Sequence, residues 1–175
     1  YVYKRSKFSS YCSEIFLTSP DKQIEKHCFD NDIPFIKTHN RHIRALDRVA
    51  EAAEKINSKD GDIITCIQGD EPMLDPKMID ILIESIINKN YKATILGIYI
   101  DDEKMWKNED IVKIIHNAKN EVLYTSRAPI PFSRKFNKKD KPCRIGGIFS
   151  FKYKYLKQFT SFKETKLEKL ESCDS

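Results

Sequence analysis

The sequence contains no uninterrupted apolar run that approaches the roughly 20 residues needed to span a bilayer, and 33% of its 175 residues are charged. A transmembrane protein is therefore excluded. Glycine and proline are also scarce, with 5 and 7 residues. Because large apolar residues recur throughout, intrinsic disorder is excluded as well. The sequence predicts a single soluble domain, residues 1–175, with enough apolar side chains to bury a core.

The 5 cysteines form no CxxC pair, and an odd number cannot pair completely into disulfides. They indicate reduced thiols in a cytoplasmic protein and no zinc site. The sequence also lacks an initiator Met and the layout of a signal peptide, so we expect the interior of a longer protein. The net charge of +5 is modest. The mostly basic stretch Lys135–Lys141 is expected to be a mobile solvated loop, with attraction of anionic partners as the alternative.

Strand-like and helix-like segments alternate along the chain, which predicts an α/β fold with a small β excursion late in the sequence. The apolar run Ile63–Ile67 is typical of a fully buried, central parallel strand. Asp75 and Pro76 are the residues expected at the start of the helix that follows it. The expected strands are 14–18, 33–37, 63–67, 93–100 and 145–151, with a hairpin at 111–116 and 121–126; the expected helices are 2–10, 21–31, 44–57, 76–88 and two that begin at 153 and 166.

The loop Gln68-Gly69-Asp70-Glu71-Pro72 follows the apolar strand directly. In open parallel sheets, ligands bind beyond the carboxyl ends of the strands, where the loops converge. Carboxylates at that edge suit a hard divalent cation that bridges to phosphates. By position alone, a solvated turn that is capped by Asp70 and stiffened by Pro72 is an equally good interpretation.

Four motifs in sequence order resolve this ambiguity. They are QGDEP at 68–72, LYTSRAPIP at 123–131, GIFSFK at 147–152 and LEKLE at 167–171. In this order they resemble the CMP-KDO synthetase (3-deoxy-manno-octulosonate cytidylyltransferase) family, and the resemblance extends from Val2 to Ser175. His42 and Arg48 fall where that family places the outer residues of its HQSGTER segment. The resemblance implies a three-layer α/β/α Rossmann-like nucleotide-diphospho-sugar transferase fold with a small late β-subdomain.

This sequence departs from the family pattern in three places. Residues 43–47 replace the family's Gln-Ser-Gly-Thr, with Arg44 as a functional substitute, and Ile145 stands where a histidine is common. The N-terminal phosphate loop and the C-terminal segment with a second metal-binding Asp are absent, so the chain is expected to be truncated at both ends, which leaves open whether this fragment is active. The departures leave another sugar acid, such as an acylneuraminate, open as the substrate.

The resemblance further implies transfer of a cytidylyl group from CTP to an acidic sugar in lipopolysaccharide synthesis, by a cytoplasmic homodimer with Mg²⁺. It makes Asp70 the metal ligand and Asp70 and Arg127 the catalytic residues. Gln68 and Arg48 would bind the nucleotide, and the sugar acid would contact Arg127, Glu168, Glu171 and His42. Lys113 would either support the same anionic pocket or lie on the surface.

The competing interpretations are structural. Arg48 could instead pair with Glu51 or Glu54, and Glu168 and Glu171 could form a solvated helix face. A non-catalytic basic binding module on the same scaffold is the alternative from another class of function, although no nucleic acid partner and no membrane span are expected.

Overall fold

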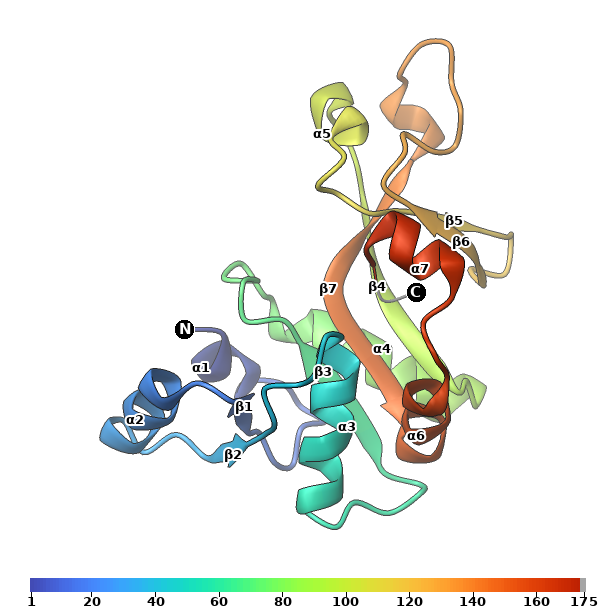
Figure 1. The fold of residues 1–175 in the computed structure, drawn as a ribbon. Coiled ribbons are helices and arrows are strands. Elements are labelled where there is room, and N and C mark those ends of the chain that lie inside the picture. The colour runs from blue at the N-terminus through green and yellow to red at the C-terminus, as the bar shows by residue number, and fades with distance from the viewer. Residues whose placement is uncertain (174–175) are drawn as a thin grey trace. The chain divides into compact units, whose positions relative to one another are not determined.

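The computed structural model describes residues 1–173, so the last two residues of the predicted domain 1–175 lie outside the described part. The chain divides into two compact units. Unit 1 comprises residues 1–94 and 147–163, and unit 2 comprises residues 95–146 and the chain from Glu164 onward. Figure 1 labels the elements of both units. No helix within residues 1–173 is both long and apolar enough to cross a membrane.

Unit 1 begins with a short helix, α1 (Val2–Ser6), and a parallel strand pair. Strands β1 (Leu17–Ser19) and β2 (Phe35–Lys37) pair in register, and helix α2 (Lys22–Asp30) connects them. Asp21 caps α2, because its carboxylate accepts the backbone N–H groups of Gln23 at 2.6 Å and Ile24 at 3.1 Å. The sequence predicted each of these elements, with both strands two residues longer and the first helix four residues longer than observed.

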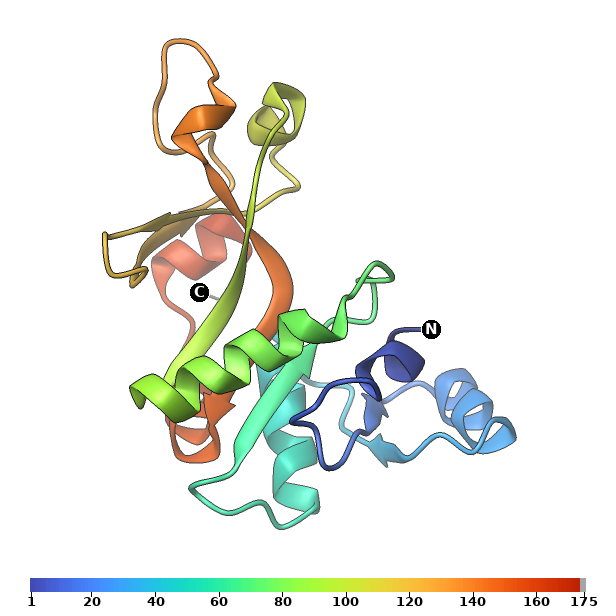
Figure 2. The same ribbon diagram turned by 180° about the vertical axis from the view of Figure 1, so that it is seen from behind.

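Two helices cover opposite faces of strand β3 (Ile63–Ile67), as Figures 1 and 2 show together. Helix α3 (Ala45–Lys55) buries Leu46, Ala52 and Ala53. Helix α4 (Pro76–Lys89) buries Ile79, Leu82, Ile83 and Ile86, an apolar stripe at helical spacing. Asp75 caps α4 by accepting the backbone N–H of Lys77 at 3.0 Å, as predicted. Unit 1 therefore contains the helix, strand and helix layers that the alternating pattern indicates.

Strand β3 does not have the environment that the sequence predicted. It pairs antiparallel with β7 (Cys143–Lys152), with Ile63 opposite Lys152 and Ile67 opposite Ile148. Only Cys66 is buried, and β3 is the end strand of the order β3-β7-β5-β6 in the described residues. The prediction of a central, fully buried parallel strand was wrong, because a short apolar run carries no information about strand direction. Helix α6 (Tyr153–Ser161) follows β7 directly.

Unit 2 is built around an antiparallel hairpin, β5 (Lys113–His116) and β6 (Val122–Ser126), which the sequence predicted. Asn117 shapes its turn, because the side-chain oxygen accepts the backbone N–H groups of Lys119 and Glu121 at 2.9 Å. The first part of β7 pairs with β5, and β7 also pairs with β4 (Ala93–Tyr99). Helices α5 (Glu103–Lys107) and α7 (Lys166–Glu171) and a 3₁₀ turn at Lys138–Asp140 complete the unit; α5 and the turn were not predicted.

Candidate active site

The loop after β3 is fixed to strand β7. The backbone N–H of Gln68 donates to the carbonyl oxygen of Gly147 at 3.0 Å. Gly147 has a positive φ of 68°, and a Cβ atom placed on it would lie 2.6 Å from Oε1 of Glu71. The side chain of Glu71 therefore lies directly over the glycine. These contacts hold both ends of the segment that carries Asp70.

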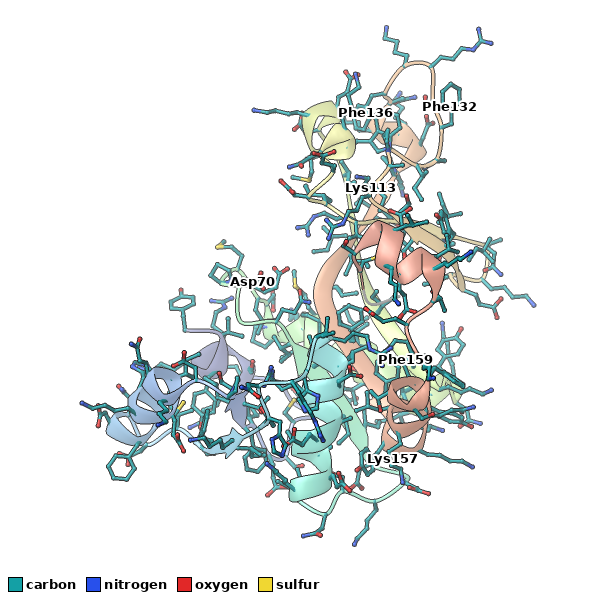
Figure 3. The ribbon with its side chains drawn as sticks, viewed as in Figure 1. Asp70, Lys113, Phe132, Phe136, Lys157 and Phe159 are labelled. Atoms are coloured by element: carbon teal, nitrogen blue, oxygen red, sulfur yellow. The ribbon has the colours of Figure 1, made fainter. Side chains whose placement is uncertain are left out.

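Asp70 lies at the exposed tip of this loop, between β3 and α4 (Figure 3). Within residues 1–173 its carboxylate takes part in no hydrogen bond or ion pair, and the side-chain amide of Gln68 is equally unengaged. No group of three His, Cys, Asp or Glu side chains that could hold a metal ion exists in the same residues. A single available carboxylate fits Mg²⁺, which usually takes one or two protein carboxylates and completes its shell with phosphates and water.

Arg48 orders the loop that follows β2. Its guanidinium donates to the hydroxyl oxygen of Thr38 at 2.8 Å and to the carbonyl oxygen of His39 at 3.0 Å. Arg48 forms no ion pair with Glu51 or Glu54 in the described residues, so that alternative is wrong. Arg48 thus connects helix α3 to the residues just after β2, and it remains only half-buried.

Glu51, one turn beyond Arg48, holds the same loop from the other side. Its carboxylate accepts the backbone N–H of His39 at 3.1 Å, pairs with Lys55 at 2.8 Å and contacts Nε2 of His42. Burial by itself raises the pKa of Glu51, but the hydrogen bonds from Lys55, His42 and His39 outweigh burial and lower the pKa to about 2. The structure therefore brings His42 and Arg48 to one loop, and Glu51 is a residue of this cluster that the sequence indicates only as a possible partner of Arg48.

Arg44 has a structural position. It is buried, donates to Asp47 at 2.8 Å and lies over the Phe159 ring, 5.2 Å from its centroid. Its guanidinium also donates to the carbonyl oxygens of Thr160 and Phe162 at the end of α6. These contacts join α3 to α6 within unit 1.

In unit 2, Arg127 and Glu171 are bound to each other. The backbone N–H of Arg127 donates to the Glu171 carboxylate at 2.8 Å. The guanidinium of Arg127 donates to the carbonyl oxygens of Glu171 at 2.5 Å, Ser172 at 2.8 Å and Glu109 at 3.0 Å. The N–H of Arg127 lowers the pKa of Glu171, assisted by the hydroxyls of Ser126 and Tyr124. Arg127 therefore fixes the end of α7 to the residue that follows β6.

Glu168 is buried and belongs to the capping box of α7, in which its carboxylate accepts the N–H of Thr165 at 2.6 Å. The interpretation of Glu168 and Glu171 as a solvated helix face is wrong for both residues, because each carboxylate is committed to a specific contact. The prediction that these residues bind a sugar stays a prediction.

Lys113 is fully buried, so its placement on the surface is wrong. Its ammonium donates to three carbonyl oxygens, those of Asn108 at 2.8 Å, Ile111 at 2.6 Å and Arg127 at 2.5 Å. Burial lowers the pKa of Lys113, and the nearby positive charge of Arg127 lowers it further, whereas Glu171 opposes the shift. Lys113 connects three segments of unit 2, and it was missed as a core residue because lysine is almost never fully buried.

Several known proteins are similar to this chain over nearly its whole length. The chain is 32% identical, over 99% of its length, to the 3-deoxy-manno-octulosonate cytidylyltransferase of Thermodesulfovibrio yellowstonii, of which it covers 72%. It shows the same identity and coverage with the enzyme of that name from Helicobacter acinonychis. A solved structure of CMP:2-keto-3-deoxy-manno-octonic acid synthetase in complex with CTP matches 99% of the chain and 70% of its own length, with a TM-score of 0.87 and 26% identity.

A second solved structure, 4-diphosphocytidyl-2C-methyl-D-erythritol synthase, is 12% identical with a TM-score of 0.58 and matches in fold alone. These comparisons confirm the predicted α/β fold class and define an enzyme of the nucleotidyltransferase class. The chain belongs to the cytidylyltransferase family, whose sequence pattern it matches over residues 1–174.

Proposed function

We propose that this enzyme transfers the cytidylyl group of CTP to 3-deoxy-manno-octulosonate and releases pyrophosphate, a step in lipopolysaccharide synthesis. The observation that carries the proposal is the match of 99% of the chain to a synthetase structure that was solved with CTP. The names of relatives that are 32% identical support the same sugar acid. The QGDEP loop, fixed to Gly147 in this chain, supports a site at the end of β3.

The reaction is a displacement at the α-phosphorus of CTP. A hydroxyl oxygen of the sugar forms the new bond to phosphorus and gives up its proton, while the bond from that phosphorus to the pyrophosphate oxygen breaks. Because charge develops on phosphate oxygens, catalysis depends mainly on positioning and on cations near those oxygens. Mg²⁺ would supply that positive charge when bound, and Asp70 is the residue proposed to hold it, since its carboxylate has no other partner within residues 1–173.

The remaining residues receive roles that follow from their contacts. Gln68 has a side chain available for the nucleotide, next to a backbone that is already fixed to β7. Arg48, held by Thr38 and His39, is proposed to bind the nucleotide. His42, held by Glu51, is proposed to bind the sugar acid.

Arg127, Glu168 and Glu171 of unit 2 are proposed to bind the sugar acid. The hydrogen bonds between Arg127 and Glu171 fix α7 to the end of β6, and Glu168 caps α7 itself, so all three act first as positioning residues. The guanidinium of Arg127 has five N–H donors. Three of them donate to carbonyl oxygens, so two remain for a substrate carboxylate.

The enzyme is further proposed to work as a homodimer in the cytoplasm. Large apolar side chains of unit 2 are exposed, among them Leu123 on β6 at 64% and Leu170 on α7 at 79%, which supports burial against a second copy. Sedimentation velocity on the protein measures this directly: a monomer at all concentrations would remove the dimer from the proposal.

Pyrophosphate release from CTP by the whole gene product, with a panel of sugar acids, tests the function. We expect release with 3-deoxy-manno-octulosonate in the presence of Mg²⁺; release only with an acylneuraminate would change the substrate, and no release with any sugar acid would refute the enzyme assignment. The variant Asp70→Asn should lose Mg²⁺-dependent CTP binding, measured by calorimetry, at least tenfold. Asp101→Asn is the matched control, since Asp101 is also exposed and unpaired within the described residues. Equal affinities of the two variants would remove Asp70 from the metal site.

A further inference from the structure

Most of the net charge of the chain is concentrated in one surface loop. Residues 132–141, here called the basic loop, contain five basic residues and one acidic residue, a net charge of +4 out of +5 for the whole chain. The basic residues are Arg134, Lys135, Lys138, Lys139 and Lys141, and all five are exposed. None forms an ion pair within residues 1–173. The proposed transfer reaction gives no role to this concentration of charge.

The basic loop is held in place at its base. The Phe136 ring packs against Trp106 of α5, with 5.9 Å between the ring centroids. The indole N–H of Trp106 donates to the carbonyl oxygen of Ile130 at 3.1 Å, just before the loop. The Asn137 side chain caps the 3₁₀ turn by accepting the N–H of Lys139 at 3.0 Å. The charges are therefore presented on an organised segment.

A large apolar side chain lies next to these charges. Phe132 is 85% exposed, whereas Phe136 is turned toward α5 (Figure 3). An exposed aromatic ring beside a cluster of lysines combines the two contributions that bind proteins to anionic membrane surfaces, apolar insertion at the headgroup level and attraction to acidic lipids. Single-stranded nucleic acid is a poorer fit, because it needs several free aromatic faces along a basic groove, and Phe132 is the only exposed aromatic ring of the basic loop.

We propose that the basic loop binds the surface of a membrane that contains anionic lipids, with Phe132 inserted among the headgroups. The binding is peripheral and reversible, since about five basic residues and one ring fall far short of a spanning segment. It would hold the enzyme where lipid-linked products of its activated sugar are assembled, and it leaves the transfer chemistry unchanged.

Co-sedimentation with lipid vesicles tests the proposal. We expect the protein to bind vesicles of 70% phosphatidylcholine and 30% phosphatidylglycerol at low salt, and not vesicles of phosphatidylcholine alone. Each basic residue near such a surface contributes about a fivefold change in affinity. The triple variant K135Q/K138Q/K139Q should therefore bind about 100-fold more weakly, and Phe132→Ser about tenfold more weakly.

Two controls match these variants. The triple variant K22Q/K26Q/K77Q removes three exposed lysines from unit 1, and Phe29→Ser removes a ring that is 83% exposed, close to the 85% of Phe132. Both should bind the acidic vesicles as the unmodified protein does. Trp106, the only tryptophan in the chain, reports the position of the loop, because lipids with brominated acyl chains should quench its fluorescence when the loop lies on the vesicle.

Three results would overturn the proposal. They are failure to bind the acidic vesicles, equal weakening by the control variants, and binding to RNA that is as tight as binding to vesicles and insensitive to Phe132→Ser. The last result would assign the loop to nucleic acid. The variants are at exposed positions, so loss of folding, checked by circular dichroism, is not expected to obscure the comparison.

Discussion

Replacing Gly147 by alanine perturbs the contact that fixes the QGDEP loop. Gly147 has a φ of 68°, and its missing Cβ would lie 2.6 Å from Oε1, 2.8 Å from Cγ and 3.0 Å from Cδ of Glu71. The substitution therefore has two costs, one in the backbone and one in the side chain above it. Gly69, in the same loop, has no left-handed backbone, and a Cβ added to it would meet no atom within 4 Å, so it is the matched control.

The expected cost follows from these two contributions. A residue with a Cβ in the left-handed region costs about 1–2 kcal/mol, and moving the half-exposed Glu71 side chain to a poorer rotamer costs about 0.5–1.5 kcal/mol. Alanine also restricts the unfolded chain, which returns about 0.4–1 kcal/mol. Gly147→Ala should therefore destabilise the protein by about 0.5–3 kcal/mol, whereas Gly69→Ala should be neutral or up to about 1 kcal/mol stabilising.

Urea unfolding followed by circular dichroism measures both variants, and a double-mutant cycle with Glu71→Ala separates the two costs. In the Glu71→Ala background, the cost of Gly147→Ala should fall by about 0.5–1.5 kcal/mol, because only the backbone contribution remains. An unchanged cost in that background would show that Glu71 does not lie on Gly147. A Gly147→Ala variant as stable as Gly69→Ala would refute the reasoning altogether.

Two further predictions concern buried charge. The pKa of Glu51 is lowered from 4.5 to about 2 in the folded protein, so its stabilisation is present above pH 4.5 and is lost as the pH falls toward 2. This stabilisation amounts to roughly 3 kcal/mol before solvent screening and about 1–2 kcal/mol after it. The urea midpoint of Glu51→Gln should therefore change less with pH over this range than that of the unmodified protein, and an equal pH dependence of the two midpoints would contradict the prediction. Lys113→Met leaves three carbonyl oxygens without their donor and should cost about 3 kcal/mol in thermal unfolding, whereas Lys119→Met, at an exposed position of the same hairpin, should cost less than about 0.5 kcal/mol.

Most of the fold could be predicted, because local signals set the elements. The Asp75-Pro76 cap and the apolar spacing of α3 and α4 placed all four boundaries of these two helices within two residues. The pairing of the strands could not be predicted from local signals, because the direction of β3 depends on β7, which lies about 80 residues later in the chain. Helix α5 was missed, since its five residues are too few to show a periodicity, although Asp102 caps it through the N–H groups of Lys104 and Met105.

The order of the motifs assigns Asp70, Arg48 and Arg127 to the candidate site, and this assignment stays a prediction. The groups that hold these residues in place could not be predicted, because they come together only in the folded chain. Gly147 is one such group, because only the folded chain brings it beneath Glu71. Lys113 is another: its side chain is buried only because three carbonyl groups, from positions 108, 111 and 127, converge on it.

The enclosure of Lys113 has a practical consequence. An amine-reactive reagent can modify Lys119 at any time, because Lys119 lies at the exposed turn of the hairpin. It can modify Lys113 only while the carbonyl groups around that side chain have separated. The labelling rate of Lys113 therefore measures how often unit 2 opens transiently, and mass spectrometry can follow it without any engineered probe.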